Sequence, residues 1–134
     1  MKATSRSPKL LIKSKIWIED EEGKAVFGTG RLRILRAVAE RGSILAAAKA
    51  LGMSYRAVWG KIKLTEDRLG QALLTTRAGG AHGGGSELTP FAKVLVARFQ
   101  QLEDLTRTAS DAFFSGVFAN ALMYKPAVPG ESSD

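Results

Sequence analysis

Apolar residues recur every three or four positions along several stretches of the chain, which is the spacing of one face of an α-helix. The first such stretch follows Gly30, and its apolar positions are Leu32, Leu35, Val38 and Ala39. Thr29 is placed to cap this helix, because its hydroxyl can accept a backbone N–H at the helix start. We therefore expect a first helix that ends near Gly42, with its arginines directed outward.

Two shorter helices joined by a tight turn are predicted between Gly42 and Glu66. Ser43 and Ser54 stand at the two helix starts, where each hydroxyl can accept an otherwise unpaired backbone N–H. Gly52 stands between them, where glycine adopts the left-handed conformation at little cost. The small side chains at 46–48 allow the second helix to cross closely over the first.

The second helix of this pair has an apolar inner face and a polar outer face. Val58 and Ile62 share one side because they are four residues apart, and Ala57 can turn inward beside them. The outward positions carry hydrogen-bonding, basic and aromatic side chains: Ser54, Tyr55, Arg56, Trp59 and Lys63. Such a helix suits a DNA major groove, where hydrogen-bonding tips meet base edges and cations meet phosphates. The simpler alternative is a helical hairpin with a solvated basic face.

Two short strands are predicted after this pair, at 73–77 and 86–88, on either side of the glycine-rich segment 78–85. Strands around a flexible tip, directly after a helix of the recognition type, are the layout of a winged helix-turn-helix. The tip backbone can approach a phosphate or the minor groove closely, flanked by Arg77 and His82. A loop without a ligand remains the alternative. A nucleotide-binding phosphate loop is disfavoured, because the required Lys-Ser/Thr pair does not follow the glycines.

The stretch before the first helix alternates between two faces. Leu10, Ile12, Ile16 and Ile18 fall on one face, which predicts a half-buried strand over 10–18. An acidic turn and the short segment 25–27 complete a predicted β-hairpin over residues 10–27. The four consecutive acids at 19–22 indicate a solvated turn rather than a metal site.

The last helix is predicted to begin at Thr89 and Pro90, which suit the cap and the first helical position. Apolar residues then recur at steps of three or four: Phe91, Leu95, Phe99, Leu102, Leu105, Ala109 and Phe113. The pattern lasts about six turns, longer than a small domain needs to cover its own core. We therefore expect this helix to pair with its copy in a dimer that presents two recognition helices to two half-sites. The alternative is a helix that folds back on its own domain.

Composition and charge narrow the range of possible functions. The chain has 134 residues and a net charge of +7, and its basic residues concentrate between Arg31 and Gly80, which suits a polyanionic partner. The absence of cysteine and the single histidine, His82, argue against a zinc finger, a thiolate nucleophile or a histidine-based triad. We therefore expect no enzymatic activity and no cofactor. The apolar runs are too short to cross a membrane and the N-terminus lacks a signal-peptide core, which favours the cytoplasm.

The stretch from Gly42 to Ile62 resembles the helix-turn-helix of bacterial LysR-type regulators. The match is closer to the N-terminal DNA-binding domain of ModE-type, molybdate-responsive regulators. The residues that carry it are Gly42-Ser43-Ile44, Ala48, Gly52 to Arg56, Trp59, Ile62, the wing segment Thr76 to Gly85 and Leu88-Thr89. The resemblance covers about residues 27–105. It implies a winged-helix fold, homodimerisation through the first and last helices, and operator binding in bacteria.

These observations lead to one hypothesis: a homodimeric, sequence-specific DNA-binding transcriptional regulator, mostly α with small β structure. Its expected segments are a flexible basic arm (1–9), an N-terminal β-hairpin (10–27), a winged helix-turn-helix (28–88), a dimerisation helix (89–115) and a partly disordered tail (116–134). The expected DNA contacts are Ser43, Ser54, Tyr55, Arg56, Trp59, Lys63, Arg77 and His82. The expected dimer contacts are Leu32, Leu35, Phe91, Leu95, Phe99, Leu102 and Leu105.

Two further expectations follow. Molybdate binding is not supported, because the tail after Phe114 is too short for the effector domain of full-length ModE-type regulators. The alternative function is a winged-helix protein-interaction module, a co-regulator without specific DNA binding. A neutral recognition face would favour that alternative, whereas Arg56 and Lys63 argue against it.

Overall fold

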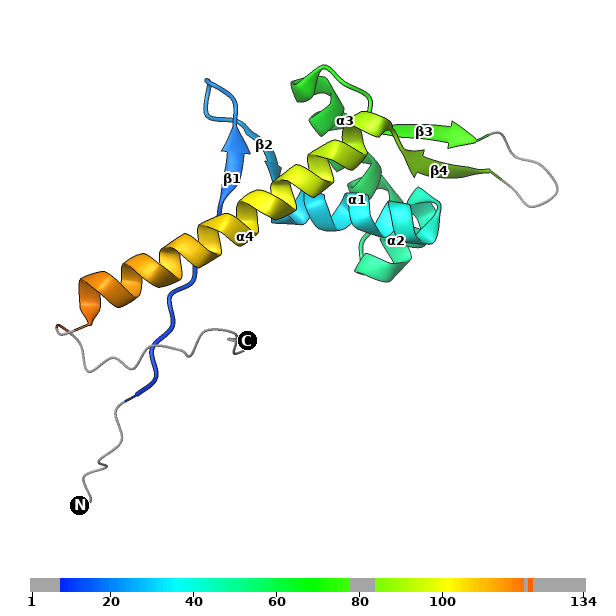
Figure 1. Ribbon diagram of the computed structural model, residues 1–134. Helices are drawn as coiled ribbons and strands as arrows, with labels where there is room; N and C mark the ends of the chain where they lie inside the picture. The colour runs from blue at the N-terminus through cyan, green and yellow to red at the C-terminus, as the bar shows by residue number, and fades with distance from the viewer. Residues whose placement is uncertain (1–7, 78–83, 120, 122–134) are drawn as a thin grey trace. The chain divides into compact units, whose positions relative to one another are not determined.

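A computed structural model of the chain describes residues 8–77, 84–119 and 121. This part contains β1 (Trp17–Glu19), β2 (Ala25–Gly28), α1 (Thr29–Arg41), α2 (Ile44–Leu51), α3 (Tyr55–Leu69), β3 (Leu74–Arg77), β4 (Gly85–Leu88) and α4 (Pro90–Phe118) (Figure 1). The predicted class, mostly helical with small β structure, is confirmed. Residues 16–101 form one compact unit, and the described residues before 16 and after 101 belong to a second.

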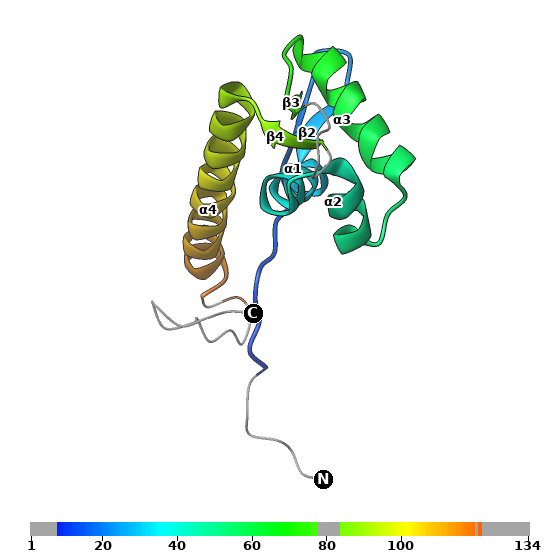
Figure 2. The same ribbon diagram turned by 90° about the vertical axis from the view of Figure 1, so that its right-hand side faces the viewer.

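Helices α1, α2 and α3 pack together in the first unit, as Figure 2 shows from a second direction. Apolar side chains from all three form a shared cluster, in which Val38, Ala47 and Val58 are fully buried. The small side chains of α2 let α3 approach closely, as their sequence predicted. This packing fixes which side of α3 faces outward.

A second apolar cluster joins β2, α1, the strands of the wing and the first part of α4. Phe27 and Phe99 meet edge to face with ring centroids 5.2 Å apart, a favourable arrangement for aromatic rings. Leu73, which precedes β3, is also buried in this cluster. The base of the wing is therefore tied into the same core as α1.

The predicted turns and caps of the helix pair are confirmed. The Ser43 hydroxyl accepts from the Ala46 N–H, and the Ser54 hydroxyl accepts from the Ala57 N–H, each at 3.0 Å. Gly52 takes a left-handed conformation with φ of 67° and ends α2. These local signals place α3 at a defined angle to α2.

The wing is an antiparallel pair in which Leu74 faces Leu88 and Arg77 faces Gly85. Its second strand is tied to the turn before α2 by the Ser86 N–H, which donates to the Gly42 carbonyl at 2.8 Å. Thr89 caps α4 as predicted, because its hydroxyl accepts from the Ala92 N–H at 3.1 Å. The predicted wing tip, including His82, lies mostly outside the described residues, as does most of the predicted tail.

The predicted strand over 10–18 is wrong in length. Strand pairing covers only Trp17 to Glu19, opposite β2, and residues 8–16 have no regular structure. The reason is that β2 is four residues long and leads directly into α1, so earlier residues have no partner strand. Ile18, which the alternation placed inward, is 39% exposed.

Two helix predictions also need correction. Thr29 is the first residue of α1 rather than its cap, because the extended backbone of β2 continues through Gly28, which occupies the cap position without a side-chain bond. Ala39 and Ala57 are exposed rather than inward, since larger neighbours such as Val38 and Val58 fill the inner side.

Three side chains expected at a dimer interface lie in the chain's own core. Leu32, Leu35 and Phe99 are 2%, 1% and 2% exposed. The first part of α4 packs on α1 and β2, so these side chains contact their own chain and are not available to a second copy. Phe91 and Leu95 are half-buried against the same cluster.

Candidate nucleic-acid interface

The outer side of α3 carries the side chains that the sequence placed there. Tyr55 and Trp59 are 47% and 45% exposed, and Arg56 and Lys63 are exposed as well. The inner side holds the buried Val58, Ile62 and Thr65. The helix thus presents aromatic and basic groups to the surroundings while its apolar side anchors it.

A cleft of about 320 Å³ lies between α3, the start of α2 and the wing. We call it the wing cleft; it is lined by residues 43–45, Tyr55, Trp59, Ile62, Lys63, Glu66, Leu74, Thr76, Arg77 and 84–86. Five of the expected DNA contacts therefore come together: Ser43, Tyr55, Trp59, Lys63 and Arg77. Ser54 and Arg56 are exposed but do not line it.

Lys63, which the sequence placed outward as a DNA contact, is paired within the chain. Its ammonium lies 5.8 Å from the centre of the Trp59 ring and 3.2 Å from Oε1 of Glu66. A cation at this distance from an indole is held by the ring's electron density as well as by the carboxylate. Trp59 and Lys63 therefore form one ordered wall of the wing cleft.

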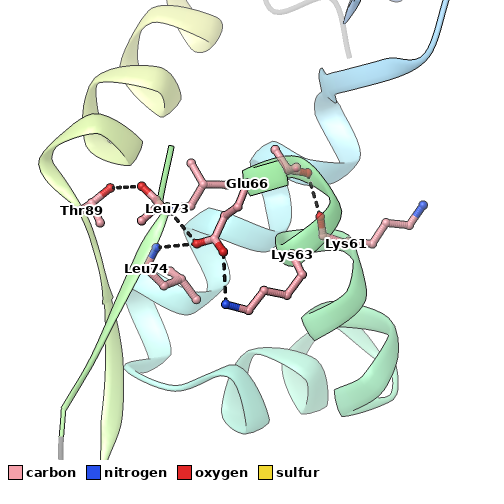
Figure 3. Close-up of polar contacts among 8 residues, drawn as sticks. Lys61, Lys63, Glu66, Leu73, Leu74 and Thr89 are labelled. Atoms are coloured by element: carbon pink, nitrogen blue, oxygen red, sulfur yellow. Dashed lines mark hydrogen bonds and ion pairs between the residues drawn. The ribbon is translucent and has the colours of Figure 1, made fainter. Parts of the chain in front are cut away.

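Glu66 is a site residue that the sequence analysis missed. Its Oε2 accepts from the backbone N–H of Leu73 at 2.7 Å and of Leu74 at 3.4 Å (Figure 3). The available signal was an acid three residues after Lys63 in an otherwise basic segment. That spacing predicts an ion pair within the helix, but not bonds to the following strand.

Arg77 is the last residue of β3 before the wing tip, and its guanidinium lies over the opposite strand. A Cβ atom at the opposite residue, Gly85, would come within 2.2 Å of Nη2 of Arg77 and 2.7 Å of the Gly42 carbonyl oxygen. Only glycine leaves room for this close approach of backbone and side chain. The guanidinium of Arg77 is therefore held beside the turn that precedes α2.

Ser43 and Ser54 both use their hydroxyl oxygens as helix caps. A capping hydroxyl keeps its proton, so each can still donate one hydrogen bond to a phosphate or a base. In any contact with DNA these hydroxyls can therefore act only as hydrogen-bond donors. Capping also fixes their positions at the two helix starts.

Two arginines of the basic segment have structural contacts. Nε of Arg31 donates to the hydroxyl of the buried Thr65 at 2.7 Å, and burial lowers the pKa of Arg31, with a smaller effect from nearby Arg68. Arg68 donates to the Ala25 carbonyl. Arg31, which the sequence placed outward, is thus half-buried, and the two side chains support the fold.

Within 8–77 and 84–119 no group of three or more His, Asp or Glu side chains is arranged to hold a metal ion. Among the helices in that part of the chain, none combines the length and the hydropathy that a membrane span requires.

Residues 29–93 match the family model described as bacterial regulatory helix-turn-helix protein, lysR family. Over 73% of its length the chain is 34% identical to the molybdenum transport protein ModE of Azotobacter vinelandii, of which it covers 36%. Over 62% of its length it is 36% identical to the molybdenum-pterin-binding protein MopB of Rhodobacter capsulatus, of which it covers 31%. The chain thus spans about a third of the length of these curated relatives.

The fold is similar to that in the crystal structure of the complex between the CbnR DNA-binding domain and DNA. The TM-score is 0.50 at 27% identity, and the match covers 66% of this chain and 95% of that one. The resemblance to LysR-type and ModE-type DNA-binding domains, stated from the sequence, is confirmed. So is the winged-helix fold.

Proposed function

We propose that this chain, whose residues 29–93 form a helix-turn-helix domain of the lysR type, is a DNA-binding transcriptional regulator. The observation that carries the proposal is the exposed side of α3, which presents Tyr55, Arg56 and Trp59 beside the wing cleft. The similar CbnR domain was crystallised with DNA, which supports the same ligand here.

In this proposal α3 enters the major groove. Arg56 contacts a base edge, since it is exposed near the start of α3, where recognition helices meet the bases. Lys63 and Arg77 meet phosphates from the two sides of the wing cleft. The wing then follows the flanking DNA, where the sequence also suggests His82 as a contact.

We also propose that the protein is a homodimer. In α4 after Gln101 several large apolar side chains are exposed: Leu102 at 45%, Leu105 at 61%, Phe113 at 71% and Val117 at 71%. They recur at helical spacing, and large exposed apolar side chains grouped on one side of a helix are typical of an interaction surface. A second copy that covers the stripe would supply a second α3 for a second half-site.

Two consequences follow for partners and location. The proposed ligand is chromosomal DNA, so we propose that the protein acts in the bacterial cytoplasm. The names of the relatives refer to molybdenum, but the similarity covers only about a third of their length. Molybdate binding is therefore not part of the proposal.

Binding of the purified protein to DNA fragments that flank its gene, compared with random DNA over a salt series, tests the function. We expect site-selective binding whose affinity falls steeply with salt, because phosphate contacts release counterions. An absence of DNA binding at low salt would refute the proposal and favour the protein-interaction module instead.

The variant Arg56→Ala tests the base contact. We expect a loss of about tenfold on the selected site, corresponding to one base contact, and little change on random DNA. Thermal stability should stay the same, because Arg56 is exposed. Lys49→Ala, which removes one exposed charge from α2 outside the wing cleft, is the matched control. Equal losses of Arg56→Ala on selected and random DNA would leave only a phosphate contact.

A further inference from the structure

We infer that Glu66 is a positioning residue that sets the wing relative to α3 and thereby contributes to selectivity for the DNA site. The inference rests on the proposed function, since selectivity has a meaning only for a protein that binds DNA. Its structural part concerns the link between a helix and a strand and can be tested without DNA.

Glu66 bonds to both sides of the α3–β3 junction. Its main-chain carbonyl accepts from the N–H of Gly70 at 2.8 Å and of Gln71 at 3.3 Å, which closes the end of α3. Its side chain accepts from the N–H groups of Leu73 and Leu74, at the start of β3 (Figure 3). The helix itself ends at the left-handed Gly70, so what the Glu66 side chain adds is the link from α3 to the start of the wing.

The carboxylate also orders one wall of the wing cleft. Oε1 pairs with the ammonium of Lys63, which in turn lies over Trp59. The side chain of Glu66 is only 14% exposed, and hydrogen bonds to an ionised group in such surroundings are among the strong ones. The same group thus fixes the wing and two of the side chains proposed to meet DNA.

The position of Leu73 is passed on along the wing. The Leu73 carbonyl accepts from the Thr89 N–H at 2.9 Å, and β3 continues from Leu74 to Arg77 in register with β4. A shift at the start of β3 therefore moves Arg77 relative to α3. Arg77 and α3 can contact the DNA together only if the distance between them fits the distance between their two contact points on the DNA.

Electrostatics alone predicts the opposite effect for Glu66. A negative charge beside a surface that binds a polyanion opposes binding, so its removal should increase affinity for every DNA sequence. A positioning role predicts a loss that is confined to the selected site. The sign of the change therefore separates the two explanations.

The test compares three variants on selected and random DNA. Glu66→Gln keeps an oxygen that can accept from Leu73 but loses the ion pair, and we expect it to retain the selectivity of the wild type. Glu66→Ala loses both, and we expect about a tenfold loss on the selected site, as for the removal of a buried hydrogen-bond partner. Asp67→Ala, which removes an exposed acid from the next position, should bind both DNAs slightly more tightly.

Hydrogen exchange of the Leu73 and Leu74 amides provides the second readout. We expect faster exchange in Glu66→Ala and rates close to wild type in Glu66→Gln. If Glu66→Ala does not fold, Glu66→Asp carries the test, because its side chain is one methylene shorter and draws the carboxylate back from the Leu73 and Leu74 amides. It should then lose selectivity in the same way.

Three results would overturn the inference. The first is tighter binding of both Glu66 variants to both DNAs, as for Asp67→Ala. The second is a lower melting temperature with an unchanged ratio of selected to random affinity. The third is unchanged exchange at Leu73 and Leu74 in Glu66→Ala. A wild-type protein without site-selective binding would refute the proposed function instead. The exchange rates would still show whether Glu66 holds the start of β3 to α3.

Discussion

At the scale of single residues, the position of Arg77 depends on the absence of a Cβ atom at Gly85. Arg77 lies over Gly85, and the Gly42 carbonyl approaches the same point from the turn before α2. The Ser86 N–H bonds to that carbonyl at 2.8 Å. Three segments thus meet where Gly85 has no Cβ atom, and the position of Arg77 is a consequence of this close packing.

Gly85→Ala should therefore weaken both stability and DNA binding. Arg77 can swing away from a new methyl group, but the Gly42 carbonyl is backbone and the wing must shift, at a cost of about 2 kcal/mol. Thermal unfolding and DNA titration measure the two effects. Gly30→Ala, where a Cβ atom meets nothing within 4 Å, is the control and should be neutral or stabilising. A Gly85→Ala protein with wild-type stability would contradict the crowding at this point.

At the scale of elements, the turn between β1 and β2 is held by one carboxylate. Oδ1 of Asp20 accepts from the N–H of Lys24 at 3.0 Å and of Glu22 at 2.9 Å. The bond from Lys24 is the larger cause that lowers the pKa of Asp20, and the bond from Glu22 adds to it. The acidic turn thus has a structural role.

This pKa direction predicts an acid-sensitive turn. Because the folded pKa lies below the unfolded one, the bonds add stability above the ordinary value of 3.8 and lose it as pH falls through the lower, folded pKa. The amide resonances of Glu22 and Lys24 should therefore shift only below that ordinary value. In Asp20→Asn the amide oxygen still accepts but does not titrate, so this transition should vanish. A wild-type midpoint at or above the ordinary value would contradict the prediction.

The elements also show how far a sequence pattern reaches. Ser43, Ser54 and Gly52 act on their own helix, so local spacing was enough to predict the caps and the turn. The prediction of a strand over 10–18 was wrong because an alternating pattern describes one strand and says nothing about the length of the strand that pairs with it. The bonds from Glu66 to Leu73 and Leu74 were not predictable for a related reason, since they cross from a helix to the next strand.

At the scale of the whole molecule, the periodicity of α4 left one question open. A period of three to four predicts an apolar side of the helix but not which surface covers it. Phe99 is covered by the chain itself, whereas Leu105 and Phe113, on the same helix, are 61% and 71% exposed. The same pattern therefore serves the core in one part of α4 and, in our proposal, a second copy in the other.

Phe113→Glu and Leu105→Glu should convert the proposed dimer into monomers. Both side chains are exposed within one chain, so folding should be little affected, whereas a charge buried between two copies should weaken association by about 100-fold. Sedimentation equilibrium measures this directly. Thr108→Glu introduces the same charge at an exposed position on a different side of the helix from Phe113 and is the control for Phe113→Glu.

DNA titrations of these variants then connect assembly to function. Two linked α3 helices bind two half-sites with far higher apparent affinity than one, because the second contact becomes intramolecular. We therefore expect Phe113→Glu to bind a two-half-site fragment no better than a fragment with one half-site, while Thr108→Glu keeps the wild-type preference. A Phe113→Glu protein that remains a dimer would move the interface away from this stripe. A wild-type protein that binds its selected site as a monomer would refute the proposed homodimer.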